Sequence, residues 1–128
     1  MRTQAPKFEV VNPGQYRLEE DYDVPYNTGI LGYQLNIPMK FALNKAGWMV
    51  VKKGFLWDGP SGPAINTVSC MGASLAHDAL YGALRKRYII KSHKKAADKL
   101  YRRMLKGAGV GYVRRWYHWA AVAVFGRV

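Results

Sequence analysis

The stretch VSCMGASLAHDALYGALRK, residues 68–86, decides how the chain can fold, because it reads as a helix that is apolar around most of its circumference. At about 100° per residue, its apolar side chains cover a wide arc. The narrow strip left over carries six side chains, namely Cys70, Ser74, His77, Asp78, Tyr81 and Arg85. We therefore expect a mostly buried helix whose one polar strip holds a titratable pair, His77 and Asp78.

Upstream of this helix, residues 7–57 read as β structure. Short β-branched or aromatic segments alternate there with Pro, Gly and Asn. The segments are KFEVV (7–11), QYRLEEDYDV (15–24), GILGYQLNIP (29–38), KFAL (40–43) and GWMVV (47–51), with NKAG (44–47) as a hairpin turn. Residues 58–66, DGPSGPAIN, carry too much Gly and Pro for regular structure and predict an ordered loop.

Downstream, the pattern predicts a second helix from after Ser92 to about Lys106 and a third over YVRRWYHWAAVAVF, residues 112–125. The expected fold is an α+β single domain over residues 1–128, with a β-rich part (1–57), a Gly/Pro loop (58–67) and a helical part (68–128). A small N-terminal antiparallel sheet would be followed by three helices. The first two would run antiparallel and carry a site formed by one His and two Asp residues.

Charge is distributed unevenly along the chain. Lys and Arg number 20 against 8 acidic residues, a net charge of +12, and five of the acids precede residue 24. From residue 24 onward, 17 cations face only Asp58, Asp78 and Asp98, which gives 17 − 3 = +14. Such a field attracts nucleic acid or an anionic lipid surface. With no recognised nucleic-acid motif, binding to nucleic acid would be non-specific.

Other sequence features exclude several classes of protein. The single cysteine, Cys70, excludes an internal disulfide and a cysteine-based zinc site. MRTQAPKFEVV lacks the apolar core of a signal peptide, so secretion by that route is not expected. No uncharged stretch approaches the roughly 20 residues of a membrane span, so no transmembrane segment is expected.

The His77–Asp78 pair suggests acid–base chemistry. A histidine that acts as a base needs a partner to fix its other ring nitrogen. Adjacent helical residues point about 100° apart, so Asp78 cannot orient His77, and Asp98 on the next helix is the candidate. Tyr81, one turn from His77, could hydrogen-bond that carboxylate. We expect Nδ1 of His77 to lie within hydrogen-bonding distance of Asp98, in a cleft that water can enter.

A Gly/Pro loop can aim successive backbone carbonyl oxygens at one point, where a hard cation would bind. The loop WDGPSG, residues 57–62, immediately precedes the helix that carries His77, and Asp58 adds a carboxylate. A base, an orienting acid and a cation site together suit the attack of water on an ester.

These motifs resemble known families. HDALY (77–81) after a Gly-rich loop resembles the phospholipase A2 superfamily, and WDGPSG is similar to the loop of the parvovirus capsid phospholipase. GFLWDGPSGP (54–63), HDALY, AADKLY (96–101) and AVAVFG (121–126) are similar to the signature of a small family of phage and prophage proteins, over residues 25–126. The resemblance implies catalytic roles for His77, Asp98 and Tyr81. It implies calcium ligands at Trp57, Asp58, Gly59 and Asp78.

Plainer interpretations stand beside each of these. His77, Asp78 and Asp98 could form a buried polar network that fixes helix packing, and Asp58 could cap its loop. A second set of residues could contact a bilayer or a polyanion, and its Trp members could equally close the core. That set is Arg85, Lys86, Arg87, Arg114, Arg115, Trp116 and Trp119.

Two functions follow as hypotheses. The first is a phage-encoded phospholipase A2-like protein, virion-associated and acting at the host envelope, with calcium as cofactor and an anionic lipid surface as partner. The alternative is a non-enzymatic phage tail or neck component that uses its basic surface to bind other virion proteins, an acidic partner or DNA. An intracellular phage effector that binds a host factor is a third. The expected location is the phage virion or the host cytoplasm.

Overall fold

The computed structural model describes residues 5–58 and 68–107 of the chain. In these two ranges, seven short strands precede two α-helices. The strands are β1 (Phe8–Asn12), β2 (Gln15–Leu18), β3 (Tyr22–Asp23), β4 (Leu35–Ile37), β5 (Phe41–Leu43), β6 (Met49–Val51) and β7 (Leu56–Trp57). The helices are α1 (Val68–Arg85) and α2 (Lys94–Gly107), and one 3-10 turn, η1 (Lys91–His93), leads into α2.

The strands form two antiparallel sheets within the described ranges. One has three strands in the order β1-β2-β7, and the other has four in the order β3-β6-β5-β4. The predicted fold, one small sheet followed by three helices, is therefore wrong: the described chain has two sheets and two α-helices. The third predicted helix, residues 112–125, lies outside the described residues.

The chain passes from one sheet to the other at a corner formed by the acidic residues 19–21, which were predicted to lie inside one continuous strand. QYRLEEDYDV was expected to be continuous, but β2 ends at Leu18 and β3 begins at Tyr22. The side chain of Asp21 ties the corner down, because its Oδ1 accepts the backbone N–H of Lys53 at 2.8 Å. Beyond the corner β3 pairs with β6, whereas β2 pairs with β1 and β7.

The strand predicted over 29–38 is shorter in the structure, because two of its glycines adopt a backbone conformation that does not fit a strand. Gly29 and Gly32 have φ of 74° and 86°, in the left-handed region that favours glycine. An extended strand cannot contain such residues, and regular pairing begins only at Leu35. The hairpin turn predicted at NKAG is confirmed, because the N–H of Gly47 donates to the carbonyl of Asn44 between β5 and β6.

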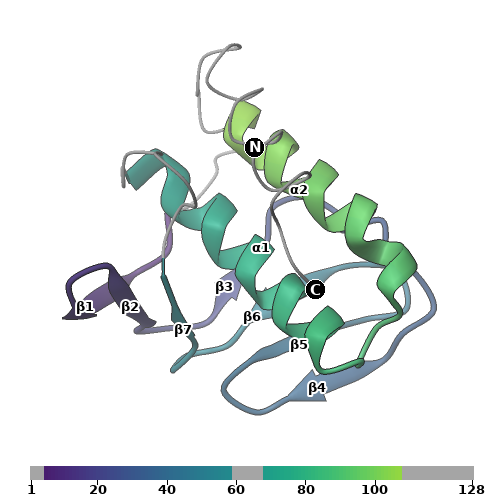
Figure 1. Ribbon diagram of the computed structural model, residues 1–128, viewed down its shortest axis with the longest axis horizontal. Coiled ribbons are helices and arrows are strands. Elements are labelled where there is room, and N and C mark those ends of the chain that lie inside the picture. Colours follow the sequence, from purple (N-terminus) through teal and green to yellow (C-terminus); the bar gives the residue numbers. More distant parts are fainter. Residues whose placement is uncertain (1–4, 59–67, 108–128) are drawn as a thin grey trace.

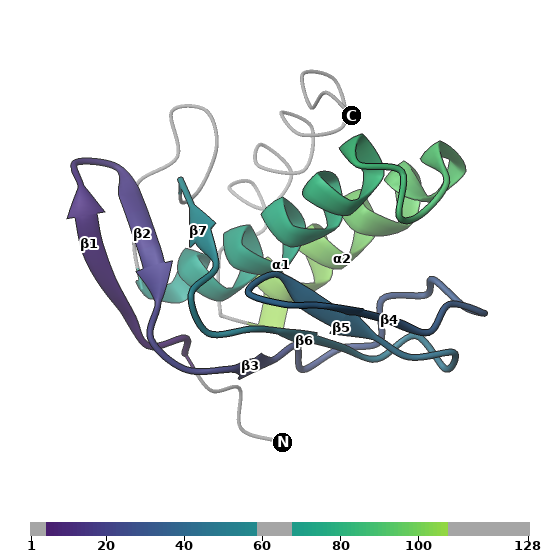
Figure 2. The same cartoon turned by 90° about the horizontal axis from the view of Figure 1, so that it is seen from below.

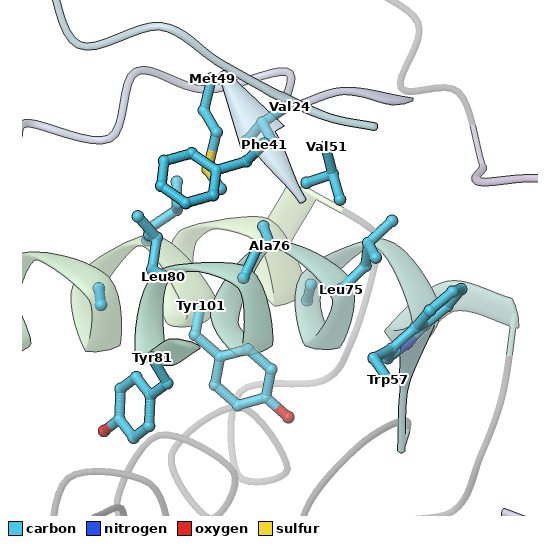
Figure 3. Packing of buried hydrophobic residues seen from close by; sticks show 14 of the residues in the cluster. Val24, Phe41, Met49, Val51, Trp57, Leu75, Ala76, Leu80, Tyr81 and Tyr101 are labelled. Atoms are coloured by element: carbon cyan, nitrogen blue, oxygen red, sulfur yellow. The ribbon is translucent and has the colours of Figure 1, made fainter. Parts of the chain in front are cut away.

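The helices form a layer over one face of the four-stranded sheet, and the three-stranded sheet stands beside the first turns of α1 (Figures 1 and 2). Figure 3 shows the core between sheet and helix. Phe41, Met49 and Val51 approach from the sheet, and Leu75 and Leu80 approach from α1. Full burial of such side chains is worth about 1.5–3 kcal/mol each, so this seam fixes the position of α1.

Helix α1 is buried on its apolar arc and on most of its polar strip, in which Asp78 is half-buried and Arg85 is exposed. Cys70, Ser74, His77 and Tyr81 all lie below 5% exposure. The strip is covered because α2 runs antiparallel to α1 and packs against it (Figure 1). The prediction of a mostly buried helix is thus confirmed, with α2 covering the side on which the titratable residues lie.

No helix in the described ranges is long and apolar enough to cross a membrane.

Candidate functional site

The packing of α1 against α2 brings together two titratable side chains from distant parts of the sequence. The Nε2 atom of His77 lies 3.0 Å from Oδ1 of Asp98. This contact confirms the predicted proximity of the two residues. The contacting ring nitrogen is Nε2, and the expectation of Nδ1 is wrong. Nε2 is at the far end of the imidazole and can reach across to the neighbouring helix, whereas Nδ1 lies close to its own backbone.

Asp98 is the centre of the cluster. Its Oδ1 also accepts the Tyr81 hydroxyl at 2.7 Å, and its Oδ2 accepts the Lys94 ammonium at 2.9 Å. Hydrogen bonds that involve a charged partner are stronger than neutral ones, so this carboxylate is held firmly. Tyr81, predicted to brace the site, does contact the predicted carboxylate.

Electrostatics favour a neutral imidazole beside an ionised carboxylate. Burial lowers the pKa of His77 below its usual value, and the hydrogen bond to Asp98 offsets only part of that effect. Burial alone would raise the pKa of Asp98, but hydrogen bonds from His77, Tyr81 and Lys94 bring it below its ordinary value. Burial and the bond to Asp98 raise the pKa of the Tyr81 hydroxyl, which stays protonated. The Nε2–H of His77 therefore donates to Asp98.

The imidazole ring is also held by aromatic neighbours. The His77 ring centroid lies 4.0 Å from that of Tyr81 and 4.9 Å from that of Tyr101. Among the described residues, no side chain makes a hydrogen bond to Nδ1 of His77. His77 and Asp98 are each 4% exposed, and the cleft expected beside them stays a prediction. With one nitrogen fixed and the ring clamped, Nδ1 is the atom left to take a proton.

Two acidic residues, Asp58 and Asp78, lie close together near the end of β7. Asp78 is half-buried on α1, and its Oδ2 is 3.5 Å from the backbone nitrogen of Asp58. The pKa of Asp78 is raised to about 7, chiefly by burial and to a smaller extent by the charge of Asp58, although the hydrogen bond from the Asp58 backbone and the charge of Arg85 oppose the rise. A cation beside Asp78 would offset both effects, because positive charge favours the ionised carboxylate. The predicted ligands Asp58 and Asp78 are therefore neighbours, although the backbone N–H of Asp58 makes the contact and not its carboxylate.

The other predicted calcium ligands are placed differently. The side chain of Trp57 is buried, and its indole N–H donates to Ser74 Oγ at 3.2 Å, so only its backbone carbonyl could serve an ion. Gly59 lies outside the described residues. Calcium takes six to eight oxygen ligands, and no group of three or more His, Cys, Asp or Glu residues that could hold a metal ion occurs in the described chain. Asp58, Asp78 and the Trp57 carbonyl are oxygen donors of the kind that a hard cation prefers, and they supply part of a calcium ligand set.

The predicted surface residues fall into two groups. Arg85, Lys86 and Arg87 are exposed at the end of α1. Arg85 also lies over the Tyr81 ring, with its guanidinium carbon 5.9 Å from the centroid. The remaining four, which lie outside the described residues, are Arg114, Arg115, Trp116 and Trp119.

Two residues of the site escaped the sequence analysis. Lys94 precedes Asp98 by one helical turn, the spacing of an i,i+4 ion pair, and that spacing could have identified it. Tyr101 lies within the predicted second helix but was given no role in the site. No pattern in the sequence indicates that its ring would pack on His77.

Comparison with known proteins adds a family. The family model described as "Protein of unknown function (DUF1353)" matches residues 33–122, which is more than half of the chain. The chain belongs to the DUF1353 family. Searches of curated proteins and of solved structures gave no match.

The match places the whole His77–Asp98 site within the DUF1353 region. The matched residues run from before β4 to beyond the end of α2, so they include both helices, Asp58 and Asp78. Strands β1, β2 and β3 precede the match. Among the described elements, the match therefore covers strands β4 to β7, the 3-10 turn η1 and both helices.

Proposed function

We propose that this DUF1353 chain is a lipid-ester hydrolase of the phospholipase A2 type, with His77 as the general base. One observation supports it above the others. A neutral imidazole donates Nε2–H to an ionised Asp98 at 3.0 Å and has no second hydrogen-bond partner at Nδ1 among the described residues. A general base needs this arrangement of an orienting acid on one nitrogen and a lone pair on the other.

The reaction follows from the two ring nitrogens. Nδ1 of His77 accepts a proton from water as the water oxygen attacks the ester carbonyl and forms a tetrahedral oxyanion. The oxyanion collapses, the bond to the alcohol oxygen breaks, and the proton on Nδ1 passes to that leaving oxygen. Asp98 stabilises the transient imidazolium and keeps the ring in one tautomer. Tyr81 donates to the same carboxylate oxygen and so limits its rotation.

Asp58 and Asp78 are the described residues that would hold a calcium ion, with the carbonyl of Trp57 as a third oxygen. When bound, such an ion supplies positive charge that stabilises an ester oxyanion. The contact of the Asp58 backbone with the Asp78 carboxylate and the raised pKa of Asp78 support this assignment.

We place this activity at an anionic lipid surface. The exposed cations Arg85, Lys86 and Arg87 at the end of α1 suit lipid phosphates. The resemblance of the HDALY and AADKLY motifs to phage proteins supports a virion-associated enzyme that acts on the host envelope.

The test measures fatty-acid release from vesicles of an anionic diester phospholipid, with calcium and with a chelator. Vesicles of the ether-linked analogue, which has no ester to hydrolyse, serve as the substrate control. We expect release from ester vesicles only. His77→Asn, which keeps a polar side chain, should reduce the rate by about 10²–10⁴, the usual contribution of a general base.

His93→Asn is the matched control variant. His93 lies in η1, where its ring meets the edge of Tyr33 at 5.6 Å, and the variant should hydrolyse at the wild-type rate. The proposal fails if the wild type releases no fatty acid in calcium, or if folded His77→Asn is as active as the wild type.

Lys94 favours a second function. Its ammonium lies 2.9 Å from Asp98 and balances the buried charge, as expected of a polar network that specifies helix packing. The protein would then be a non-enzymatic structural module, such as a phage tail or neck component, that docks through its basic surface. It would release no fatty acid, and calcium would leave its melting temperature unchanged.

A further inference from the structure

A cavity of about 240 Å³ lies between the last turns of α1 and the β4–β5 edge of the four-stranded sheet. Its lining from the sheet side includes Ile37 and Phe41, and its lining from α1 includes Ala79 and Gly82. At 100° per residue, Ala79 and Gly82 lie on the opposite side of α1 from His77. Figure 3 agrees, since Tyr81 points away from Phe41 and the sheet. The cavity is thus separate from the His77–Asp98 site.

The chemistry of the cavity is that of an apolar chamber with a basic rim. Its apolar walls are Ile37, Phe41, Phe55, Ala79, Ala83 and Tyr88. The rim carries Lys40, Arg85 and Lys86, and the described residues that line the cavity include no Asp or Glu. Tyr88 closes one wall by an edge contact with Phe41 at 6.4 Å. A ligand here would need an apolar body and an anionic end.

Gly82 keeps the cavity open at a cost to the helix. Glycine in a helix interior is about 1 kcal/mol less favourable than alanine. Gly82 is not needed for positive φ, and a Cβ at this position would meet nothing within 4 Å. Gly72 differs, because a Cβ there would lie 2.6 Å from the Tyr22 hydroxyl. Packing of the fold therefore does not require glycine at position 82, and the absence of a side chain there leaves the adjacent cavity open.

We propose that this cavity binds one chain of a fatty carboxylate, with the alkyl chain on Phe41 and Gly82 and the carboxylate at Lys40 and Lys86. The volume lies below the 300–1,000 Å³ of pockets for drug-sized ligands, so it suits a single chain better than a two-chain lipid. Charge complementarity selects the anionic end group. The inference goes beyond the proposed hydrolysis and does not require it.

The test titrates the full chain with decanoate, below its micelle-forming concentration, by calorimetry and by amide chemical-shift mapping. We expect saturable 1:1 binding with shifts at the end of α1 and in β4–β5. Decanol and decyltrimethylammonium share the chain but not the negative charge, and should bind at least about tenfold more weakly. Equal binding of either one would overturn the proposed role of the basic rim.

Variants at Gly82 test the chamber itself. Gly82→Leu should fill the cavity and weaken decanoate binding more than about tenfold. Gly82→Ala should raise the melting temperature, because a helix glycine becomes alanine, and should weaken binding to a smaller extent. A lower melting temperature for Gly82→Ala, or wild-type binding by folded Gly82→Leu, would contradict the proposal.

Lys86→Gln tests the rim and should weaken binding several-fold. Lys45→Gln, an exposed lysine in the 44–47 turn that does not line the cavity, should bind decanoate as the wild type does. Ester hydrolysis is measured in parallel for each Gly82 variant. Loss of binding with hydrolysis unchanged supports a separate site, and loss of both together contradicts it.

Discussion

Asp98 accepts hydrogen bonds from three donors, and the order of their importance can be measured. Replacing Asp98 by Asn removes the charge that selects the Nε2–H tautomer of His77, and should lower kcat for ester hydrolysis by about 10²–10⁴. Tyr81→Phe removes one neutral donor and should lower kcat by no more than about tenfold. KM should change little in both variants, because neither residue touches the lipid.

The pH dependence of the hydrolysis rate distinguishes a role of Asp98 in orienting His77 from general damage to the structure. Loss of the carboxylate lowers the pKa of His77 further, so the acidic limb of the profile should shift to lower pH in Asp98→Asn. An unshifted limb, or equal losses for Asp98→Asn and Tyr81→Phe, would argue against the assigned roles.

The raised pKa of Asp78 predicts that replacing this residue stabilises the fold at high pH. Its pKa in the folded state is raised to about 7 from 3.8, so the folded protein holds a proton that the unfolded chain has lost. Stability from this group is present below about pH 4 and is lost as pH rises toward 7. At pH 8, the free energy of unfolding of Asp78→Asn, measured by chemical denaturation, should therefore exceed that of the wild type by about 1–3 kcal/mol. The difference should vanish near pH 4.

Calcium gives the matching check on Asp78. If Asp58 and Asp78 hold the ion, calcium should raise the wild-type melting temperature more at pH 8 than at pH 5, because the proton competes for the same carboxylate. Asp78→Asn should lose that response. A calcium response that survives in the variant would exclude Asp78 as a ligand.

At the scale of elements, the packing of β3 on α1 depends on one glycine. A Cβ on Gly72 would lie 2.6 Å from the Tyr22 hydroxyl and 3.3 Å from the adjoining ring carbon. Gly72→Ala should destabilise the fold by about 1–3 kcal/mol, the usual effect of overpacking. Tyr22→Phe removes the closer atom and should recover part of that loss in the double variant, as measured by a chemical-denaturation cycle. Strictly additive effects would show that the two residues do not meet.

The helices were predictable because their signals are local. The 3.6-residue pattern predicted a helix over 68–86, and α1 is Val68–Arg85. The same pattern placed Asp98 on the next helix, which is why its contact with His77 could be anticipated. Sheet pairing is set by contacts between distant segments. The return of β7 to pair with β2, which makes the second sheet, therefore has no local signature.

The parts of the site that were missed have similar causes. Choosing between Nδ1 and Nε2 requires the distance between the helix axes, which no sequence pattern contains. Lys94 was given no role, although its position one turn before Asp98 allows an ion pair. No sequence pattern indicated a role for Gly82, because that role depends on the empty space beside the residue in the folded structure.

At the scale of the whole molecule, charge should oppose folding. The net charge is +12, and the like charges repel one another most at low salt. Raising sodium chloride from 0.02 to 0.3 M shortens the screening length, so the melting temperature should increase by about 2–5 °C. Scanning calorimetry at pH 7 measures this. A melting temperature that falls over this range would mean that ion pairs outweigh the repulsion.

The whole account depends most directly on the protonation state of His77. Nitrogen-detected NMR of the isotopically labelled protein at pH 7 reports which ring nitrogen carries a proton, and a pH titration reports the pKa. If His77 is the base, the ring should be neutral and protonated at Nε2 alone, with a pKa below the ordinary histidine value. A ring protonated on both nitrogens at pH 7, or on Nδ1 alone, would contradict it, because no lone pair would then be available at Nδ1 to activate water.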